Sequence, residues 1–148
     1  MVQIVLIRPG STDYDEQGRI QGTLDIPLNE QGTREVQRIV DELRTLSINA
    51  IYCGPCQCVC QTATAIADAL GAKLKVVDTL RNIDHGLWQG MLIDDVKRKQ
   101  PKVYRQWQEQ PEIICPPEGE TCRQCLAFSL PTGFPPLPNT KMFTSAQA

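Results

Sequence analysis

The sequence has few of the features that mark membrane proteins and nucleic-acid-binding proteins. No apolar run approaches the roughly 18 residues of a membrane span, and the apolar stretch 2–7 lacks a basic flank and a cleavage site. Charged residues make up 22% of the chain and the formal net charge is −2, which gives no basic field for nucleic acid or an anionic membrane. We therefore expect a cytoplasmic protein with neither kind of partner.

Histidine is almost missing, since the chain of 148 residues has only His85. One imidazole with no identifiable carboxylate or thiol partner in the sequence makes a poor catalytic unit. We therefore interpret His85 as a structural residue. Aromatic residues make up only 5% of the chain, and Trp88 and Trp107 are better explained by packing than by stacking on a ligand.

The order of the hydrophobic patterns predicts an α/β fold. The nearly continuous, β-branched run at 2–7 is typical of a strand buried on both faces. Apolar residues recur at steps of three and four over 30–46 and 59–70, which predicts two helices, and short strands are expected at 50–52 and 74–77. This alternation implies right-handed crossovers and a mostly parallel, three-layer α/β/α sheet.

Glycine and proline mark the expected ends of elements. Gly71 is placed to end the second helix, and Pro101 inside the helical pattern 94–108 predicts two short helices or a sharp kink. A chain of 148 residues has room for one core and no second full domain. We interpret 1–128 as the α/β domain and 129–148 as an irregular, Pro-rich tail.

Two expected strands end in segments suited to ligand binding, because ligands of α/β sheets collect outside the carboxyl ends of strands. The first is Arg8-Pro9-Gly10-Ser11-Thr12, and the second begins at Cys53. A basic side chain beside Gly, Ser and Thr can hold phosphate through its guanidinium group and backbone N–H groups. An ordinary surface turn is the alternative interpretation.

A series of motifs in about residues 1 to 121 resembles the histidine phosphatase (phosphoglycerate mutase-like) superfamily. The segment 8–12 stands where that family has Arg-His-Gly-x-Thr. The other segments that carry the resemblance are Gly18-Arg19-Ile20-Gln21-Gly22, Asp25-Ile26-Pro27-Leu28 with Gly32, Pro55 with Gln61-Thr62-Ala63, Leu80-Arg81 with Gly86-Leu87-Trp88-Gln89-Gly90, and Pro117-Glu118-Gly119-Glu120-Thr121. The resemblance implies the family's fold without its final strand and helix, phosphomonoester chemistry at the strand ends, and no cofactor.

The mechanism that the resemblance implies lacks its main groups here. The family uses a nucleophilic histidine, two phosphate-binding arginines, a carboxylic acid and a second histidine. Pro9 stands at the nucleophile position, and its amide nitrogen has no lone pair for attack. Asn82 stands at the acid position and cannot release a proton at neutral pH. Cys58 replaces the second arginine, and Asp15 replaces an asparagine and adds negative charge.

These replacements predict a catalytically inactive, histidine phosphatase-like protein that binds a small phosphorylated ligand weakly. The expected phosphate-binding residues are Arg8, Ser11, Thr12, Gln21, Gly22 and Arg81. A residual phosphomonoester phosphatase or mutase is the alternative. The family's final His-Gly signature has no counterpart here. Without the strand that carries this signature an inner edge of the sheet is exposed, which predicts a homo-oligomer or marginal stability.

The chain has seven cysteines, and an odd number cannot all be paired in internal disulfides. Residues 53–56 have the sequence Cys-Gly-Pro-Cys of the thioredoxin motif, which makes a thiol-redox protein one alternative function. A zinc site is the other, with Cys53, Cys56 and Cys60 on one helical face and Cys122 and Cys125 completing the ligands. We favour no metal, because buried cysteines often pack as small hydrophobic residues.

Overall fold

The computed structural model describes residues 4–129, and these form two compact units. Unit 1 contains residues 4–12 and 25–81, and unit 2 contains 13–24 and 82–129. Apart from its first residue, the tail expected at 129–148 lies outside the described residues. No helix in the described part of the chain is long and apolar enough to cross a membrane.

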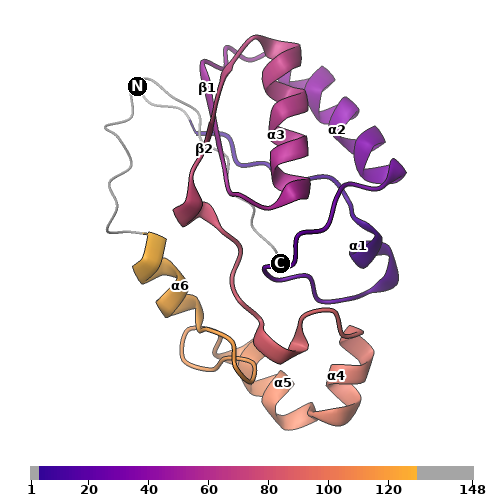
Figure 1. Cartoon of the computed structure of the whole chain (residues 1–148), viewed down its shortest axis with the longest axis vertical. Coiled ribbons are helices and arrows are strands. Elements are labelled where there is room, and N and C mark those ends of the chain that lie inside the picture. The colour runs from indigo at the N-terminus through magenta and orange to yellow at the C-terminus, as the bar shows by residue number, and fades with distance from the viewer. Residues whose placement is uncertain (1–3, 130–148) are drawn as a thin grey trace. The chain divides into compact units, whose positions relative to one another are not determined.

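Unit 1 is built from two parallel strands and two helices. Strand β1 (Ala50–Cys53) pairs with β2 (Lys73–Val76), with Ala50 opposite Lys73 and Cys53 opposite Val76. Helix α3 (Gln57–Leu70) connects the strands and packs on both, and α2 (Glu30–Leu43) packs on α3. Helix α3 therefore lies between the sheet and α2 (Figure 1). This strand–helix–strand order confirms the predicted α/β fold.

Local signals at the helix ends explain these boundaries. The side chain of Asn29 caps α2 by accepting a hydrogen bond of 2.8 Å from the Gly32 N–H. Gly71 ends α3 in the left-handed conformation with φ of 64°, as predicted. Helix α2 is shorter than the predicted helix over 30–46. It ends at Leu43, and Leu46 is exposed.

The core of unit 1 is shared by α2, β1 and α3. Ile51 and Ile66 are completely buried at its centre, and burial of one such side chain stabilises the fold by about 1.5–3 kcal/mol. The full cluster consists of Val36, Val40, Leu43, Ile48, Ile51, Cys53, Cys58, Val59, Ala63, Ile66 and Ala67.

The strand predicted over 2–7 is not formed by residues 4–7, the part of it that the structure describes. Val5 and Ile7 pack against the core of unit 1, whereas Ile4 and Leu6 are 48% and 61% exposed. The described residues contain only the two-stranded sheet, so 4–7 have no ladder partner there and are covered on one face only. The predicted strand required a neighbouring strand to pair with and a layer of structure on each of its two faces.

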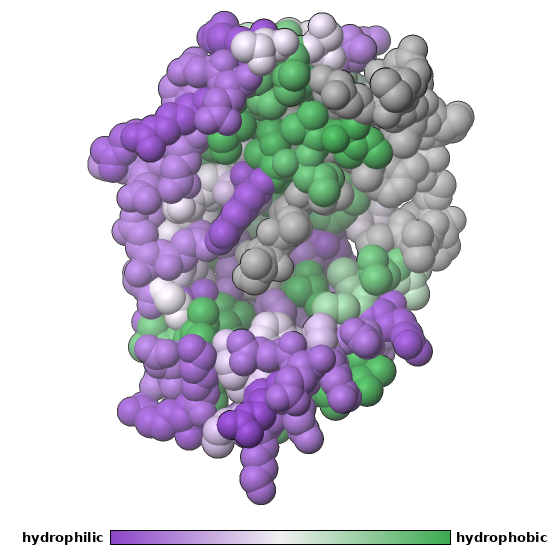
Figure 2. Space-filling view, turned by 180° about the vertical axis from the view of Figure 1, so that it is seen from behind, coloured by the Kyte–Doolittle hydropathy of each residue, from purple (hydrophilic) through white to green (hydrophobic). Residues whose placement is uncertain are grey.

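Unit 1 therefore exposes large apolar side chains. They come from the segment 4–7, from Leu46, and from β2, where Leu74 and Val76 are 36% and 49% exposed. A hydrophobic area is visible in the upper half of Figure 2. Such surface favours contact with other molecules.

Unit 2 consists of short helices around Trp88 and Val96, both completely buried. Its elements are α1 (Asp13–Gln17), the 3-10 turn η2 (Gly86–Trp88), α4 (Ile93–Lys99), α5 (Pro101–Glu109) and α6 (Cys122–Ser129). Pro101 is the first residue of α5, which confirms the predicted pair of short helices. The Trp88 indole N–H donates to the Gln100 side chain at 3.1 Å, and its ring lies 5.7 Å from that of Trp107.

Candidate functional site

The segment that follows 4–7 is held against the start of α2 by two glycines. A Cβ on Gly10 would lie 2.5 Å from the carbonyl oxygen of Gly32, and a Cβ on Gly32 would collide with the Ser11 backbone. The Asn29 N–H also donates to the Ser11 carbonyl at 3.1 Å. This close approach fixes Ser11, one of the predicted phosphate-binding residues, at the N-terminal turn of α2.

Ser11 is bound by a carboxylate of the same unit. Its backbone N–H and its hydroxyl both donate to Oε2 of Glu35, at 2.9 Å and 2.8 Å. Gln31 donates to the other carboxylate oxygen at 3.1 Å. Partial burial acts to raise the pKa of Glu35, but the bonds from Ser11 and Gln31 outweigh it. Together with the nearby charge of Arg8 they hold this pKa below its usual value.

Glu35 therefore engages two of the predicted phosphate-binding residues, Ser11 directly and Arg8 by charge. The sequence interpretation missed it because 24 residues separate it from Ser11. One signal was available: Glu35 follows Gly32 by three positions and shares its helical face, and the resemblance already placed Gly32 in register with the first motif. A phosphate at Arg8 and Ser11 would compete with this internal anion.

The second motif has a structural part in unit 1. The Gly10 N–H donates to the Thr62 hydroxyl at 3.2 Å, and that hydroxyl donates to the Cys58 carbonyl at 2.8 Å. Thr12 is almost fully buried and forms an isolated bridge with Leu28, whose N–H donates to the Gln61 side chain at 2.8 Å. Gln61 and Thr62 thus hold the first motif and the segment after it onto α3.

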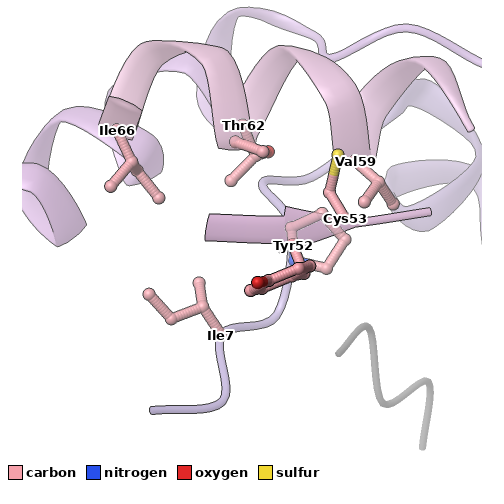
Figure 3. A pocket seen from close by; sticks show the side chains of 8 residues that line it. Ile7, Tyr52, Cys53, Val59, Thr62 and Ile66 are labelled. Carbon is pink, nitrogen blue, oxygen red and sulfur yellow. The ribbon is translucent and has the colours of Figure 1, made fainter. Parts of the chain in front are cut away.

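Pro9, at the expected nucleophile position, borders a small apolar cavity inside unit 1. Figure 3 shows this cavity from close by. The cavity volume is about 20 Å³, which is room for about one water molecule and too little for a phosphate group. Its walls are formed by Ile7, Pro9, Tyr52, Cys53, Val59, Thr62, Ala63 and Ile66. The cavity is therefore a packing feature and offers no ligand pocket.

Arg81, the other predicted phosphate-binding cation of unit 1, follows the 3-10 turn η1 (Asp78–Leu80). Its backbone N–H donates to the Asp78 carbonyl at 3.2 Å. The backbone of Leu80 lies against Gly54, where a Cβ would collide with the Leu80 carbonyl. Arg8, Ser11, Thr12 and Arg81 thus all belong to unit 1.

The remaining predicted site residues, Gln21, Gly22 and Asn82, belong to unit 2. Asn82 is buried, and its side-chain amide donates to the Gly22 carbonyl at 3.1 Å. Gly22 has a φ of +57°, and Gln21 donates to the Leu24 carbonyl at 3.2 Å. The structure therefore brings Gly22 and Asn82 together. Asn82, at the position of the family's acid, binds the backbone carbonyl of Gly22.

His85 is packed inside unit 2. It is 8% exposed, and its ring meets that of Trp107 edge-on at 5.5 Å. Its Nδ1 is buried and has no hydrogen-bond partner within the described part of the chain. Burial lowers the pKa of His85, against the opposing charges of Asp84 and Glu120. The neutral imidazole is therefore favoured, and its packing agrees with a structural role.

Cys58, at the position of the family's second arginine, lies in a group of thiols at the start of α3. Its Sγ is 3.7 Å from that of Cys56, and the Cys60 thiol donates to the Gly54 carbonyl at 3.2 Å. Burial, together with the neighbouring Cys60, raises the pKa of Cys53 to about 12. A thiol with this pKa is protonated at neutral pH, so Cys53 is a poor nucleophile despite its place in the thioredoxin-like motif.

The cysteines of the zinc site considered as an alternative are divided between the two units. Nowhere among residues 4–129 do three His, Cys, Asp or Glu side chains gather in an arrangement that could hold a metal ion. Cys53, Cys56 and Cys60 belong to unit 1, whereas Cys122 and Cys125 lie on α6 in unit 2. No disulfide bond joins any two of the seven cysteines, all of which lie within residues 4–129.

The parallel strands β1 and β2, joined by the crossover helix α3, make unit 1 an α/β structure. The model of the histidine phosphatase superfamily (branch 1) matches residues 4–127. The chain belongs to this family.

Curated relatives and solved structures agree with this assignment. Phosphoserine phosphatase 1 of Hydrogenobacter thermophilus is 34% identical over 114 residues, which are 77% of this chain and 54% of that protein. A "probable phosphoglycerate mutase" of Enterobacter sp. (strain 638) is 30% identical over 124 residues, 84% of this chain and 58% of the relative. The chain thus spans little more than half the length of these two relatives. A mycobacterial glucosyl-3-phosphoglycerate phosphatase in complex with VO3 has the same fold, with a TM-score of 0.84, 24% identity, and coverage of 95% of this chain and 73% of that one.

Proposed function

We propose that this chain is a catalytically inactive member of the histidine phosphatase superfamily that binds a small phosphorylated ligand weakly. The observation that carries the proposal is Pro9 at the nucleophile position. A proline nitrogen inside a peptide bond has its lone pair delocalised into the amide and cannot attack phosphorus. The single histidine offers no substitute, because His85 is packed inside unit 2.

Two further replaced residues, Cys58 in unit 1 and Asn82 in unit 2, support the same proposal. Cys58 is 3% exposed and brings no positive charge to the place of the family's second arginine, so a developing phosphoryl charge would be poorly balanced. Asn82 cannot protonate a leaving oxygen, and its amide holds the Gly22 carbonyl. Losing a nucleophile, a cation and an acid together removes each chemical step of phosphoryl transfer.

The binding part of the proposal depends on the cations that remain in unit 1. Arg8 is exposed and Arg81 is half-buried, and guanidinium groups bind phosphate oxygens through paired hydrogen bonds. The relatives named as a phosphoserine phosphatase and a phosphoglycerate mutase suggest a phosphomonoester as the ligand class. Affinity should be weak because Glu35 already engages Arg8 and Ser11.

The experiment combines turnover of an aryl phosphate with thermal melting in the presence of vanadate. We expect no turnover by the parent chain, and a vanadate-induced rise in melting temperature that Arg8→Ala removes. Arg38→Ala is the matched control, because Arg38 is an exposed arginine of α2 outside the first motif, and it should keep the rise. Pro9→His should gain at most slow turnover, since the second arginine and the acid are still missing.

Each part of the proposal has its own contrary result. Turnover by the parent that Arg8→Ala abolishes would favour the alternative of a residual phosphomonoester phosphatase or mutase, with a nucleophile other than histidine. The same melting temperature with and without vanadate would overturn the binding part.

A further inference from the structure

The start of α3 places two thiols side by side with different accessibility. Cys56 is the N-cap residue, with an extended backbone (φ −61°, ψ 140°), and Cys58 is the second residue of the helix. Their sulfur atoms are 3.7 Å apart, within hydrogen-bonding distance. Cys56 is half-buried, whereas Cys58 is 3% exposed. A small reagent can therefore reach the Cys56 thiol, and the buried Cys58 thiol lies next to it.

In this pair Cys56 is the thiol with the lowered pKa, and Cys58 is the hydrogen-bond donor that lowers it. The hydrogen bond from the Cys58 thiol is the largest of the influences that lower the pKa of Cys56 to about 6. Backbone N–H groups of Cys58 and Ile26 lower it further, while burial and the charge of Asp25 oppose the shift. Cys56 is thus mostly thiolate at neutral pH, and thiolates are the nucleophiles of thiol chemistry.

We propose that Cys56 and Cys58 form a thiol–disulfide exchange site that reacts with small-molecule disulfides such as glutathione disulfide. The Cys56 thiolate attacks one sulfur of the disulfide, forms a mixed disulfide and releases one glutathione thiolate. Cys58 then loses its proton and attacks the Cys56 sulfur, which forms the internal disulfide and releases the second glutathione. Two protein thiols are oxidised and one glutathione disulfide is reduced to two thiols.

The required movement is small. A disulfide bond is about 2.05 Å long, so the two sulfurs must approach by less than about 2 Å from their separation of 3.7 Å. Side-chain rotation supplies this approach most easily at Cys56, because the N-cap residue lies outside the regular helix. The proposal is independent of phosphate binding.

The other two cysteines of this segment provide a matched contrast. Cys53 ends β1, and its neighbour Cys60 donates to the Gly54 carbonyl. The pKa of Cys53 is raised to about 12 by burial and by Cys60, so Cys53 stays a protonated thiol at neutral pH. The thiol next to Cys56 in the folded chain is thus Cys58, which lies outside the thioredoxin-like sequence 53–56.

The test treats the reduced full-length chain with glutathione disulfide, blocks the remaining thiols and digests with trypsin. Cleavage after Arg44 and Lys73 yields one peptide that contains all four cysteines of the segment. Mass spectrometry of this peptide then identifies attached glutathione and internal disulfide bonds. We expect the parent to lose two thiols and retain no glutathione. Cys58→Ala should stop at one glutathione on Cys56, Cys56→Ser should react at least about ten-fold more slowly, and Cys60→Ser should behave as the parent does.

Three results would overturn the proposal. The first is a parent chain that keeps a stable mixed disulfide under conditions in which circular dichroism shows it to be folded. The second is a parent disulfide that fragment ions place between Cys53 and Cys60. The third is a Cys60→Ser variant that stops at the mixed disulfide as Cys58→Ala does. The half-buried Cys56 makes Cys56→Ser the variant best suited to fold normally, so it keeps the test decisive if Cys58→Ala misfolds.

Discussion

Replacing Glu35 by glutamine removes a negative charge from the first motif and keeps the side-chain shape. Glu35 accepts two hydrogen bonds from Ser11 and lies within the field of Arg8. A charge about 4 Å away is worth about 1 kcal/mol even at the dielectric constant of water. Glu35→Gln should therefore tighten the binding of inorganic phosphate or vanadate about five-fold, as measured by calorimetric titration.

The same substitution should cost stability. Hydrogen bonds to a charged acceptor are worth about 1 kcal/mol more than bonds between neutral groups, and the partial exposure of Glu35 reduces this difference. We expect a loss of about 1 kcal/mol and a melting temperature a few degrees lower. Because the folded pKa of Glu35 is lowered from 4.5, the carboxylate stabilises the fold above that pH and loses its effect as pH falls through the folded pKa. The difference in melting temperature between the parent chain and Glu35→Gln should therefore become smaller at acidic pH.

Glu42→Gln is the matched control, because Glu42 is an exposed residue of the same helix and the change in net charge is identical. It should leave both anion affinity and melting temperature nearly unchanged. Weaker anion binding by Glu35→Gln, or an equal gain in Glu42→Gln, would refute the inference that Glu35 competes for Arg8 and Ser11.

Three further predictions concern other parts of unit 1. Alkylation of Cys56 should rise with pH around a midpoint of about 6. Cys58→Ala should shift that midpoint upward, because it removes the hydrogen bond that lowers the pKa of Cys56 most; equal midpoints would contradict this hydrogen bond. Ile66→Ala, at a completely buried position, should lower the free energy of unfolding by about 2–5 kcal/mol in urea, and a loss below about 1 kcal/mol would contradict the described core. We propose that the chain self-associates through its exposed apolar surface, so Leu6→Lys should shift sedimentation toward the monomer; a parent that is monomeric at every concentration would exclude this.

Much of the fold could be predicted from short-range patterns. The strand positions at 50–52 and 74–77 differ from β1 and β2 by a residue or so, and Gly71 and Pro101 mark helix boundaries as expected. These features depend on hydrophobic period, backbone freedom and the missing N–H of proline, all of which a local stretch of sequence carries. The family, too, followed from the order of short motifs.

The sequence by itself determined the family, the order of β1, α3 and β2, and the absence of histidine from the nucleophile position. The tertiary structure alone decided that residues 4–7 are covered on one face, that Glu35 binds Ser11, and that Cys56 meets Cys58. Each of these depends on which side chains the folded backbone brings within a few ångströms of one another. Hydrophobic period does not encode that proximity, because it specifies which face of an element is buried and leaves open what covers it.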